Sequence, residues 1–190
     1  MTKITLASTS PRRKDLLSLI VPKFETCAPD YEEDMTLKLS PRKLVKHLAE
    51  GKCKAAVLVV GEGVVISADT IVACGNKVYG KPKSKRDLQR MLREQSGKVV
   101  SVLTGLAVYD NNSKKLISKV VEAKLHFRKL SKQEIDRYLK FDDGIDKAGG
   151  WALQGRGAAF FTKIVGDYSA IVGLPIAEVI KALNGFNIKT

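Results

Sequence analysis

The stretch that decides the fold is LASTSPRRKDLL, residues 6–17. An apolar run over residues 4–7 predicts a short strand, which ends in a turn of serine and threonine. Ser10 is a favourable helix N-cap and Pro11 suits the first helical position, so a helix is expected to begin there. The stretch therefore predicts a strand, a tight turn and a helix in immediate succession.

Two arginines fall in the first turn of this expected helix. Arg12 and Arg13 carry positive charge at the end where the helix dipole is also positive, which disfavours each by about 0.3–1 kcal/mol. A bound phosphate would compensate, because free backbone N–H groups, serine hydroxyls and guanidinium groups all bind phosphate oxygens. The alternative is that both arginines point into water, and this segment alone favours neither reading.

The rest of the chain alternates between strands and helices. Further strands are predicted over residues 24–28, 64–73, 77–79, 99–109, 115–127, 159–164 and 168–172. Further helices are predicted to begin near residues 41, 84, 131 and 174 and to end near residues 59, 97, 140 and 185. Capping boxes are expected at 84–87, in its Asp form, and at 131–134. Because hairpins are mixed into the alternation, the pattern favours an α/β domain on a mixed, partly antiparallel sheet.

Length and composition limit the protein class. A chain of 190 residues can bury one substantial core, so a single domain over residues 1–190 is expected. No apolar run is long enough to span a bilayer, and the N-terminus lacks the apolar segment of a signal peptide, so we expect a cytoplasmic protein with no membrane partner. Three cysteines without paired spacing indicate neither a disulfide framework nor a zinc site.

The net charge of +13 indicates anionic partners. The candidate classes are nucleic acid, acidic membranes and phosphorylated small molecules. The alternative is that lysines scattered over helix surfaces serve only solubility. The sequence contains no long basic block, no interleaved aromatic pattern typical of RNA-binding domains and no zinc-finger spacing. Specific nucleic-acid binding is therefore not expected.

One acidic residue breaks the pattern of its surroundings. Asp69 lies inside the apolar run 64–73, which is expected to be a buried strand. An unpaired buried carboxylate costs several kcal/mol, so it needs a cation, a metal or a water-filled cleft. A functional acid is favoured over a structural salt bridge to one of the many lysines.

Two lysines and a second acid are candidates for the same site. Lys52 falls in the middle of the apolar stripe of the expected helix 41–59, so its ammonium either reaches the surface or meets an anion in a cleft. Gly80 and Pro82 fix the backbone on either side of Lys81, although an exposed lysine in a turn explains that pattern as well. Glu33 belongs to a short acidic patch that is typical of plain surface, but with Asp69 it could hold one divalent ion.

A glycine-rich stretch, DKAGGWALQGRG over residues 146–157, has a composition that lets backbone approach a ligand. Gln154 could present its amide to the edge of a base. Trp151 could stack on a ring, but core packing is the favoured reading for a sole tryptophan.

Taken together, these stretches resemble the Maf family, also called the septum-formation-inhibitor family, of nucleoside triphosphate pyrophosphatases. The motifs that carry the resemblance are LASTSPRRKDLL, SADTIVACGNKVYGKP, DKAGGWALQGRGAAFF and GDYSAIVGLPI, in the order of the family and spanning nearly the whole chain. The resemblance implies an elongated Maf/ITPase-like α/β domain with a twisted mixed sheet flanked by helices and a cleft between two lobes. It also implies a homodimer.

The same resemblance implies the chemistry. Members cleave the bond between the α- and β-phosphates of a nucleotide with a divalent metal, Mg²⁺ or Mn²⁺. Asp69 would be the general base, and Glu33 with Asp69 would hold the metal. The triphosphate would be held by Ser8, Arg12, Arg13, Lys52 and Lys81.

Substrate choice follows from the branch of the family. The branch acting on dTTP and UTP carries Arg, Thr and Gln at its specificity positions, which match Arg12, Thr70 and Gln154 here. A glutamine amide fits uracil or thymine by two hydrogen bonds, but in the flipped orientation it fits cytosine as well. The alternatives are an enzyme selective for 7-methyl-GTP or another modified nucleotide, and a regulatory protein that binds nucleotides or nucleic acid.

The chain also departs from the family. The segment 150–153, Gly-Trp-Ala-Leu, stands where members often have Ala-Tyr-Gly-Ile, and Val100 stands where a histidine is common. The first change borders the expected base pocket, so it bears on base selectivity rather than on phosphate chemistry.

Overall fold

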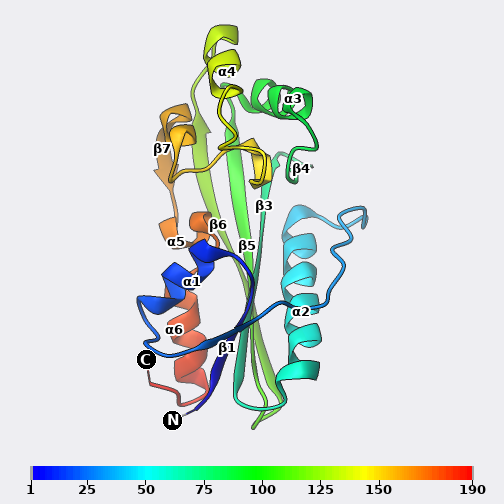
Figure 1. Ribbon diagram of the computed structural model, residues 1–190, viewed down its shortest axis with the longest axis vertical. Coiled ribbons are helices and arrows are strands. Elements are labelled where there is room, and N and C mark those ends of the chain that lie inside the picture. The colour runs from blue at the N-terminus through cyan, green and yellow to red at the C-terminus, as the bar shows by residue number, and fades with distance from the viewer. Residues whose placement is uncertain (1, 190) are drawn as a thin grey trace.

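The computed structural model describes residues 2–189, which form an elongated α/β structure around one long, twisted sheet (Figure 1). The seven strands are β1 (Ile4–Ala7), β2 (Glu25–Cys27), β3 (Val64–Cys74), β4 (Lys77–Tyr79), β5 (Val99–Asp110), β6 (Lys115–Phe127) and β7 (Phe161–Val165). The helices are α1 (Pro11–Ser18), α2 (Pro41–Val60), α3 (Lys85–Gln95), α4 (Lys132–Tyr138), α5 (Tyr168–Val172) and α6 (Ile176–Gly185), with short 3₁₀ helices η1 (Ala148–Gly150) and η2 (Arg156–Phe160).

The sheet is mixed, as the alternation of elements predicts. Its strand order is β2-β1-β3-β5-β6-β7, with β4 paired to β3. Strand β1 runs parallel to both β2 and β3, and every other pairing is antiparallel. The long strands β3, β5 and β6 extend through the whole molecule, so they connect its two ends.

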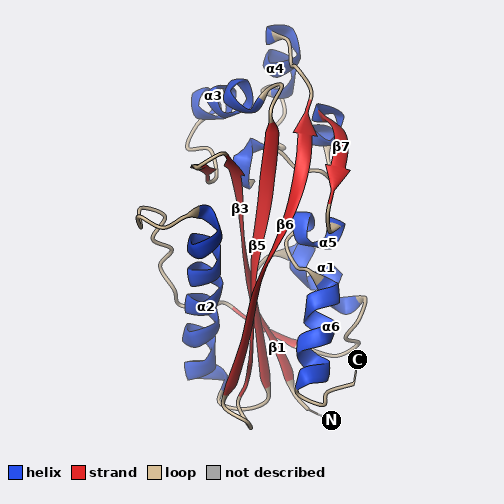
Figure 2. Cartoon of the chain, turned by 180° about the vertical axis from the view of Figure 1, so that it is seen from behind, coloured by secondary structure: helices blue, strands red, loops and turns tan. Residues whose placement is uncertain are grey.

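Helices cover the sheet differently at its two ends. Helix α2 lies on one face, with α1 and α6 on the opposite face, and Figure 2 shows the same layers from behind. Helices α3 and α4 lie at the other end of the long strands. We call these halves the α2 lobe and the α3 lobe.

Each lobe has its own apolar core. In the α2 lobe, α1 and α6 pack on one face through side chains that include Leu17 and Leu183, while α2 packs on the other face through Ala49 and Cys53. In the α3 lobe, α3 packs against an aromatic cluster; the contributing side chains include Leu88, Leu92, Phe127, Tyr138, Trp151 and Phe160. The predicted elongated fold with two lobes is therefore confirmed.

The edge of β3 is open between the two lobes. Strand β1 pairs with β3 only at residues 64–66, and β4 pairs with it only from Val72 onward. Within residues 2–189, residues 67–71 of β3 have no strand neighbour on that edge, while β5 pairs along the other edge. Asp69 and Thr70 lie in this open stretch. Their side chains point to opposite faces of the sheet, but both can reach the same gap.

Most predicted elements are confirmed to within a few residues, but the strand expected over residues 168–172 is wrong. Residues 168–172 form helix α5 instead of a strand. The Asp167 side chain accepts hydrogen bonds from the N–H groups of Ser169 and Ala170 and so caps a helix. A short apolar run does not by itself distinguish a strand from a buried helix. The strand expected over 159–164 begins at Phe161, because residues 156–160 form η2.

Of the two expected capping boxes, only the second is complete. Ser131 and Glu134 bond reciprocally, which helps to lower the pKa of Glu134 to about 2. At α3, Ser84 accepts from the Asp87 N–H, but the Asp87 carboxylate accepts from the N–H of Lys83 and from Arg90. The aspartate side chain is one methylene shorter than glutamate, and here it bonds the residue before the N-cap.

Candidate active site

All the residues singled out in the sequence line one cleft of about 780 Å³ between the two lobes. They come from seven segments of the chain and include residues from both lobes. They are Ser8, Arg12, Arg13, Glu33, Lys52, Asp69, Thr70, Lys81 and Gln154. The volume is within the usual range for small-molecule sites, about 300–1,000 Å³.

On the α2 face of the sheet, one lysine joins two carboxylates. Asp69 is 5% exposed, and its Oδ1 accepts a hydrogen bond from Nζ of Lys52, a residue that is itself 9% exposed. The same ammonium lies 2.7 Å from Oε1 of Glu33, which comes from the loop after β2. The carboxylates of Glu33 and Asp69 therefore converge on a single cation.

This arrangement resolves the alternatives that the sequence left open for Asp69 and Lys52. Asp69 does pair with a lysine, as the structural reading requires, but that lysine lines the cleft along with Asp69 itself. Lys52 does not extend to the surface. Its ammonium lies in the cleft, where it pairs with Asp69 and Glu33. Asp69 and Lys52 are thus two buried charged side chains that contact each other in the cleft.

On the other face of the sheet, Arg13 is held from three directions. Its Nε donates to the Gly173 carbonyl at 2.9 Å, Nη1 to Ser8 Oγ at 3.4 Å and Nη2 to Thr70 Oγ1 at 3.3 Å. Burial lowers the pKa of Arg13, and the nearby Asp69 opposes that effect. Arg13 therefore does not point into water, and its planar guanidinium is oriented before any ligand arrives.

A hydroxyl that the sequence did not reveal supports this arrangement. Thr104 of β5 is the register partner of Thr70 and is fully buried. Its Oγ1 donates to the Ala170 carbonyl at 2.7 Å and lies 2.9 Å from Thr70 Oγ1. Since a hydroxyl has one hydrogen, Thr70 must donate to Thr104, which leaves the Thr70 oxygen to accept from Arg13.

A second residue missed from the sequence is Tyr31, which lines the cleft beside Glu33. A Cβ on Gly51 would lie 2.3 Å from the Tyr31 ring, so only glycine allows the ring to rest on α2 there. Burial raises the pKa of the Tyr31 phenol. A glycine inside an otherwise good helix was the available signal for this close approach.

The remaining candidates lie closer to solvent. Lys81 and Gln154 are exposed and Arg12 is half-buried, and all three side chains face the cleft. The loops that carry Lys81 and Gln154 are joined, because the Gly149 N–H donates to the Gly80 carbonyl at 3.0 Å. Trp151 packs edge-on against Phe127 and Phe161, which confirms the core reading of this tryptophan.

Grouped metal ligands, thiols and membrane-spanning helices would each indicate another kind of function. Among residues 2–189, no three or more His, Cys, Asp or Glu side chains are grouped as metal ligands, and Cys27, Cys53 and Cys74 are free thiols. None of the helices in this range is both long and apolar enough to be a membrane span.

Comparisons with known proteins identify the family of the chain. Residues 3–186 match the family described as Maf-like protein. The chain is 43% identical over 188 residues to the dTTP/UTP pyrophosphatase of Bacillus pumilus (strain SAFR-032), covering 99% of this chain and 98% of that protein. It is 39% identical over 189 residues to the dTTP/UTP pyrophosphatase of Desulforamulus reducens, covering 100% and 99%.

A solved structure shares the fold. The Ham1 protein of Staphylococcus aureus has a TM-score of 0.55 and 13% identity, covering 96% of this chain and 98% of that one. At that identity the likeness concerns the fold alone, whereas the family match and the close relatives span nearly the whole sequence. This chain therefore belongs to the Maf family.

Proposed function

We propose that this protein is a metal-dependent nucleoside triphosphate pyrophosphatase that hydrolyses the α–β phosphoanhydride bond of dTTP and UTP. The observation that carries the proposal is the cleft in which a buried acid, Asp69, lies with Arg13 and Lys52. A protein that only binds an anion has no need of a buried carboxylate beside it, because that charge would repel the ligand. The full-length relatives named dTTP/UTP pyrophosphatase support the same activity.

The residues of the cleft suit the steps of this hydrolysis. Asp69 would take a proton from water as the water oxygen bonds to the α-phosphorus and the bond from that phosphorus to the bridging oxygen breaks. The products are the nucleoside monophosphate and pyrophosphate. Arg13, held by three hydrogen bonds, would neutralise charge on the leaving group without having to reorganise. The other proposed phosphate ligands are Ser8, Arg12, Lys52 and Lys81.

The carboxylates fit a hard divalent cation. Glu33 and Asp69 converge on one point, which is filled by the Lys52 ammonium. Magnesium is commonly bound by one or two carboxylates together with substrate phosphates, rather than by an all-protein set of ligands. A bound Mg²⁺ or Mn²⁺ would neutralise phosphate oxygens. In its presence Lys52 would be free to pair with phosphate.

Base selection is proposed for Gln154, Arg12 and Thr70. Gln154 faces the cleft from the α3 lobe and would bond the edge of uracil or thymine. Thr70 would act through Arg13, because its hydroxyl hydrogen is committed to Thr104. A cytoplasmic single-domain homodimer, without a specific nucleic-acid partner, completes the proposal.

The proposed activity is tested by identifying products. With Mg²⁺ or Mn²⁺, the protein is expected to release pyrophosphate and a monophosphate from dTTP and UTP. Release of orthophosphate alone would exclude cleavage at the α–β bond. Including 7-methyl-GTP and CTP in the same screen tests base selection, and faster turnover of either would replace dTTP and UTP as the substrates. Tighter binding of single-stranded DNA than of dTTP at physiological salt, without turnover, would favour a regulatory binding protein.

The hydroxyl chain behind Arg13 gives a second expectation. Thr104→Val keeps the shape of the side chain but removes the donor to Ala170 and the acceptor for Thr70, so Arg13 loses its orientation. We expect the KM for UTP to rise about 3- to 10-fold, as for the loss of one or two hydrogen bonds. Thr104→Ser keeps the hydroxyl and is the matched control, expected within about twofold of the wild type. Equal KM values for the two variants would show that the chain has no role in binding.

A further inference from the structure

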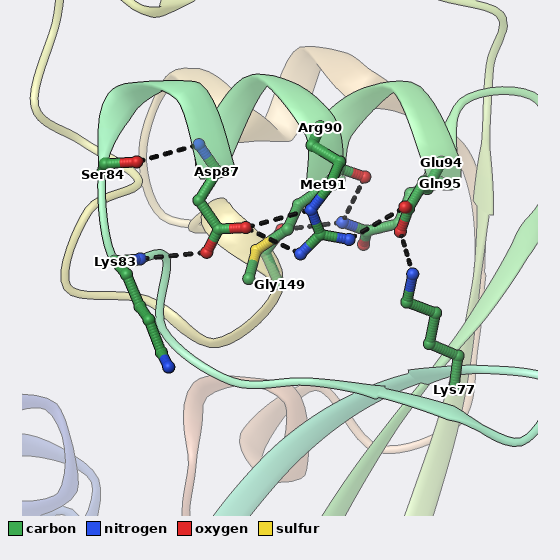
Figure 3. Close-up of polar contacts among 9 residues, drawn as sticks. All are labelled: Lys77, Lys83, Ser84, Asp87, Arg90, Met91, Glu94, Gln95 and Gly149. Carbon is green, nitrogen blue, oxygen red and sulfur yellow. Dashed lines mark hydrogen bonds and ion pairs between the residues drawn. The ribbon is translucent and has the colours of Figure 1, made fainter.

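One fully buried polar side chain belongs to none of the roles above. Gln95 is the last residue of α3, with 0% of its surface exposed, on the helix face that also buries Leu88, Met91 and Leu92. An apolar residue would fill this position without the penalty of burying an amide. Figure 3 shows the Gln95 side chain pointing from α3 toward the backbone at Gly149.

Every hydrogen-bonding group of this amide is used. Gln95 Nε2 donates to the Met91 carbonyl at 3.0 Å and to the Gly149 carbonyl at 2.8 Å. Its Oε1 accepts from the indole Nε1 of Trp151 at 2.9 Å. A flipped amide would set its NH₂ group against the indole N–H, so this network allows one orientation only. Gln95 therefore fixes both Gly149 and Trp151.

The segment that Gln95 holds leads directly to Gln154. Gly149 and Gly150 have φ angles of 75° and 82°, values that favour glycine, so this backbone follows a path that side chains would not permit. The Gly149 carbonyl is bonded to Gln95 and its N–H to the Gly80 carbonyl. Gly80 immediately precedes Lys81. One short chain of bonds thus links α3, the loop of Gln154 and the turn of Lys81.

The residue at position 151 requires this link. Trp151 is 5% exposed in the apolar cluster of the α3 lobe, and an indole N–H buried there needs an acceptor. Gln95 Oε1 provides it. Edge-on contacts with Phe127 and Phe161 also restrict the indole ring. The hydrogen bond to Gln95 then sets the final position of this ring.

We propose that Gln95 is a positioning residue that fixes the 146–154 loop relative to Lys81, and thereby couples recognition of the base to binding of the phosphates. The inference rests on the proposed pyrophosphatase function. Gln95 does not line the cleft, so it acts only through Gly149 and Trp151.

The first test replaces Gln95 with methionine, which has a similar shape but makes none of the hydrogen bonds. Gln95→Met is expected to raise the KM for UTP about tenfold, and to lower the preference for UTP over CTP at least about threefold, as two bonds to the loop are lost. The effect on kcat is expected to be smaller. Gln89→Met is the matched control, because Gln89 lies on the same helix and bonds Asp136 of α4 instead of the loop. It should stay within about twofold of the wild type in both quantities.

A second measurement reports the loop directly. Trp151 is the only tryptophan of the chain, so intrinsic fluorescence follows the group that Gln95 holds. Gln95→Met is expected to shift the emission spectrum, and Gln89→Met is expected to leave it unchanged. Wild-type KM, preference and emission in a folded Gln95→Met protein would overturn the proposal.

A third variant keeps the test decisive if Gln95→Met does not fold. In Gln95→Glu the ionised carboxylate can accept from Trp151 but cannot donate to the Gly149 carbonyl, whereas the protonated carboxyl can do both. The variant should bind UTP more weakly than the wild type and lose this defect as the pH falls. Wild-type behaviour at every pH would contradict the inference. A wild-type protein without pyrophosphate release would instead refute the proposed function, so the two failures are distinguishable.

Discussion

Replacing Asp69 with asparagine is expected to lower the rate of pyrophosphate release by about 10²- to 10⁴-fold, the usual contribution of a general base. Asparagine has nearly the same shape but cannot accept the proton of the attacking water. The fold should remain, because Lys52 keeps Glu33 as an anionic partner and the amide oxygen can still accept from its ammonium. The measurement is kcat for UTP or dTTP, with the thermal unfolding midpoint recorded alongside.

A second buried acid on the neighbouring strand provides the control. Asp110 of β5 is 6% exposed and accepts hydrogen bonds from Asn112 and Ser113 in the β5–β6 turn, outside the cleft. Asp110→Asn should lower stability modestly but leave kcat within about twofold of the wild type. If Asp69→Asn keeps more than about a tenth of the wild-type kcat, Asp69 is not the general base.

Replacing Lys52 with methionine is expected to have the largest combined effect on stability and activity. Methionine keeps much of the aliphatic stem but leaves Asp69 and Glu33 facing each other without a cation. Removing one partner of a buried ion pair costs about 3–5 kcal/mol, and we expect the lower end because Glu33 is 46% exposed and the cleft admits water. Turnover should fall at least about 100-fold, as a cation beside the phosphates is lost.

Two comparisons separate this effect from a general loss of charge. Lys46→Met, on the same helix, removes an exposed pair with Glu50 at 3.7 Å and should change stability by less than about 1 kcal/mol. The double variant Lys52→Met with Asp69→Asn should be more stable than Lys52→Met alone, since no unpaired buried charge remains. Chemical denaturation gives both free energies of unfolding. A double variant whose losses simply add would show that the two side chains are not coupled.

Much of the fold could be predicted because its signals are local. The N-cap and proline at Ser10 and Pro11, the apolar run of β3 and the complete capping box at Ser131 each lie within a few residues of the element that they define. The segment 168–172 shows the limit of such signals. Its apolar residues suit either a strand or a buried helix, and the helix is decided by the capping carboxylate of Asp167 and by packing against α1 and β5.

The candidate site likewise has one part that could be predicted from the sequence and another that could not. Asp69 and Lys52 could be singled out because each places a charge among apolar neighbours, and such a charge requires a compensating group. That the two compensate each other could not be predicted. Their pairing depends on α2 lying over the stretch of β3 that carries Asp69, a relation between segments distant in the chain.

By itself, the sequence determined the order of most elements, the buried acid and the arginines at the start of α1, since capping, periodicity and burial are properties of neighbouring residues. Only the tertiary structure decided that β1 ends and β4 begins on either side of Asp69 and Thr70, which opens the sheet edge where the cleft forms. It also brought in Thr104 and Gln95, which carry no signal in the sequence. Their contacts join residues far apart in the chain, and such hydrogen bonds exist only once the strand register and the packing of α3 are fixed.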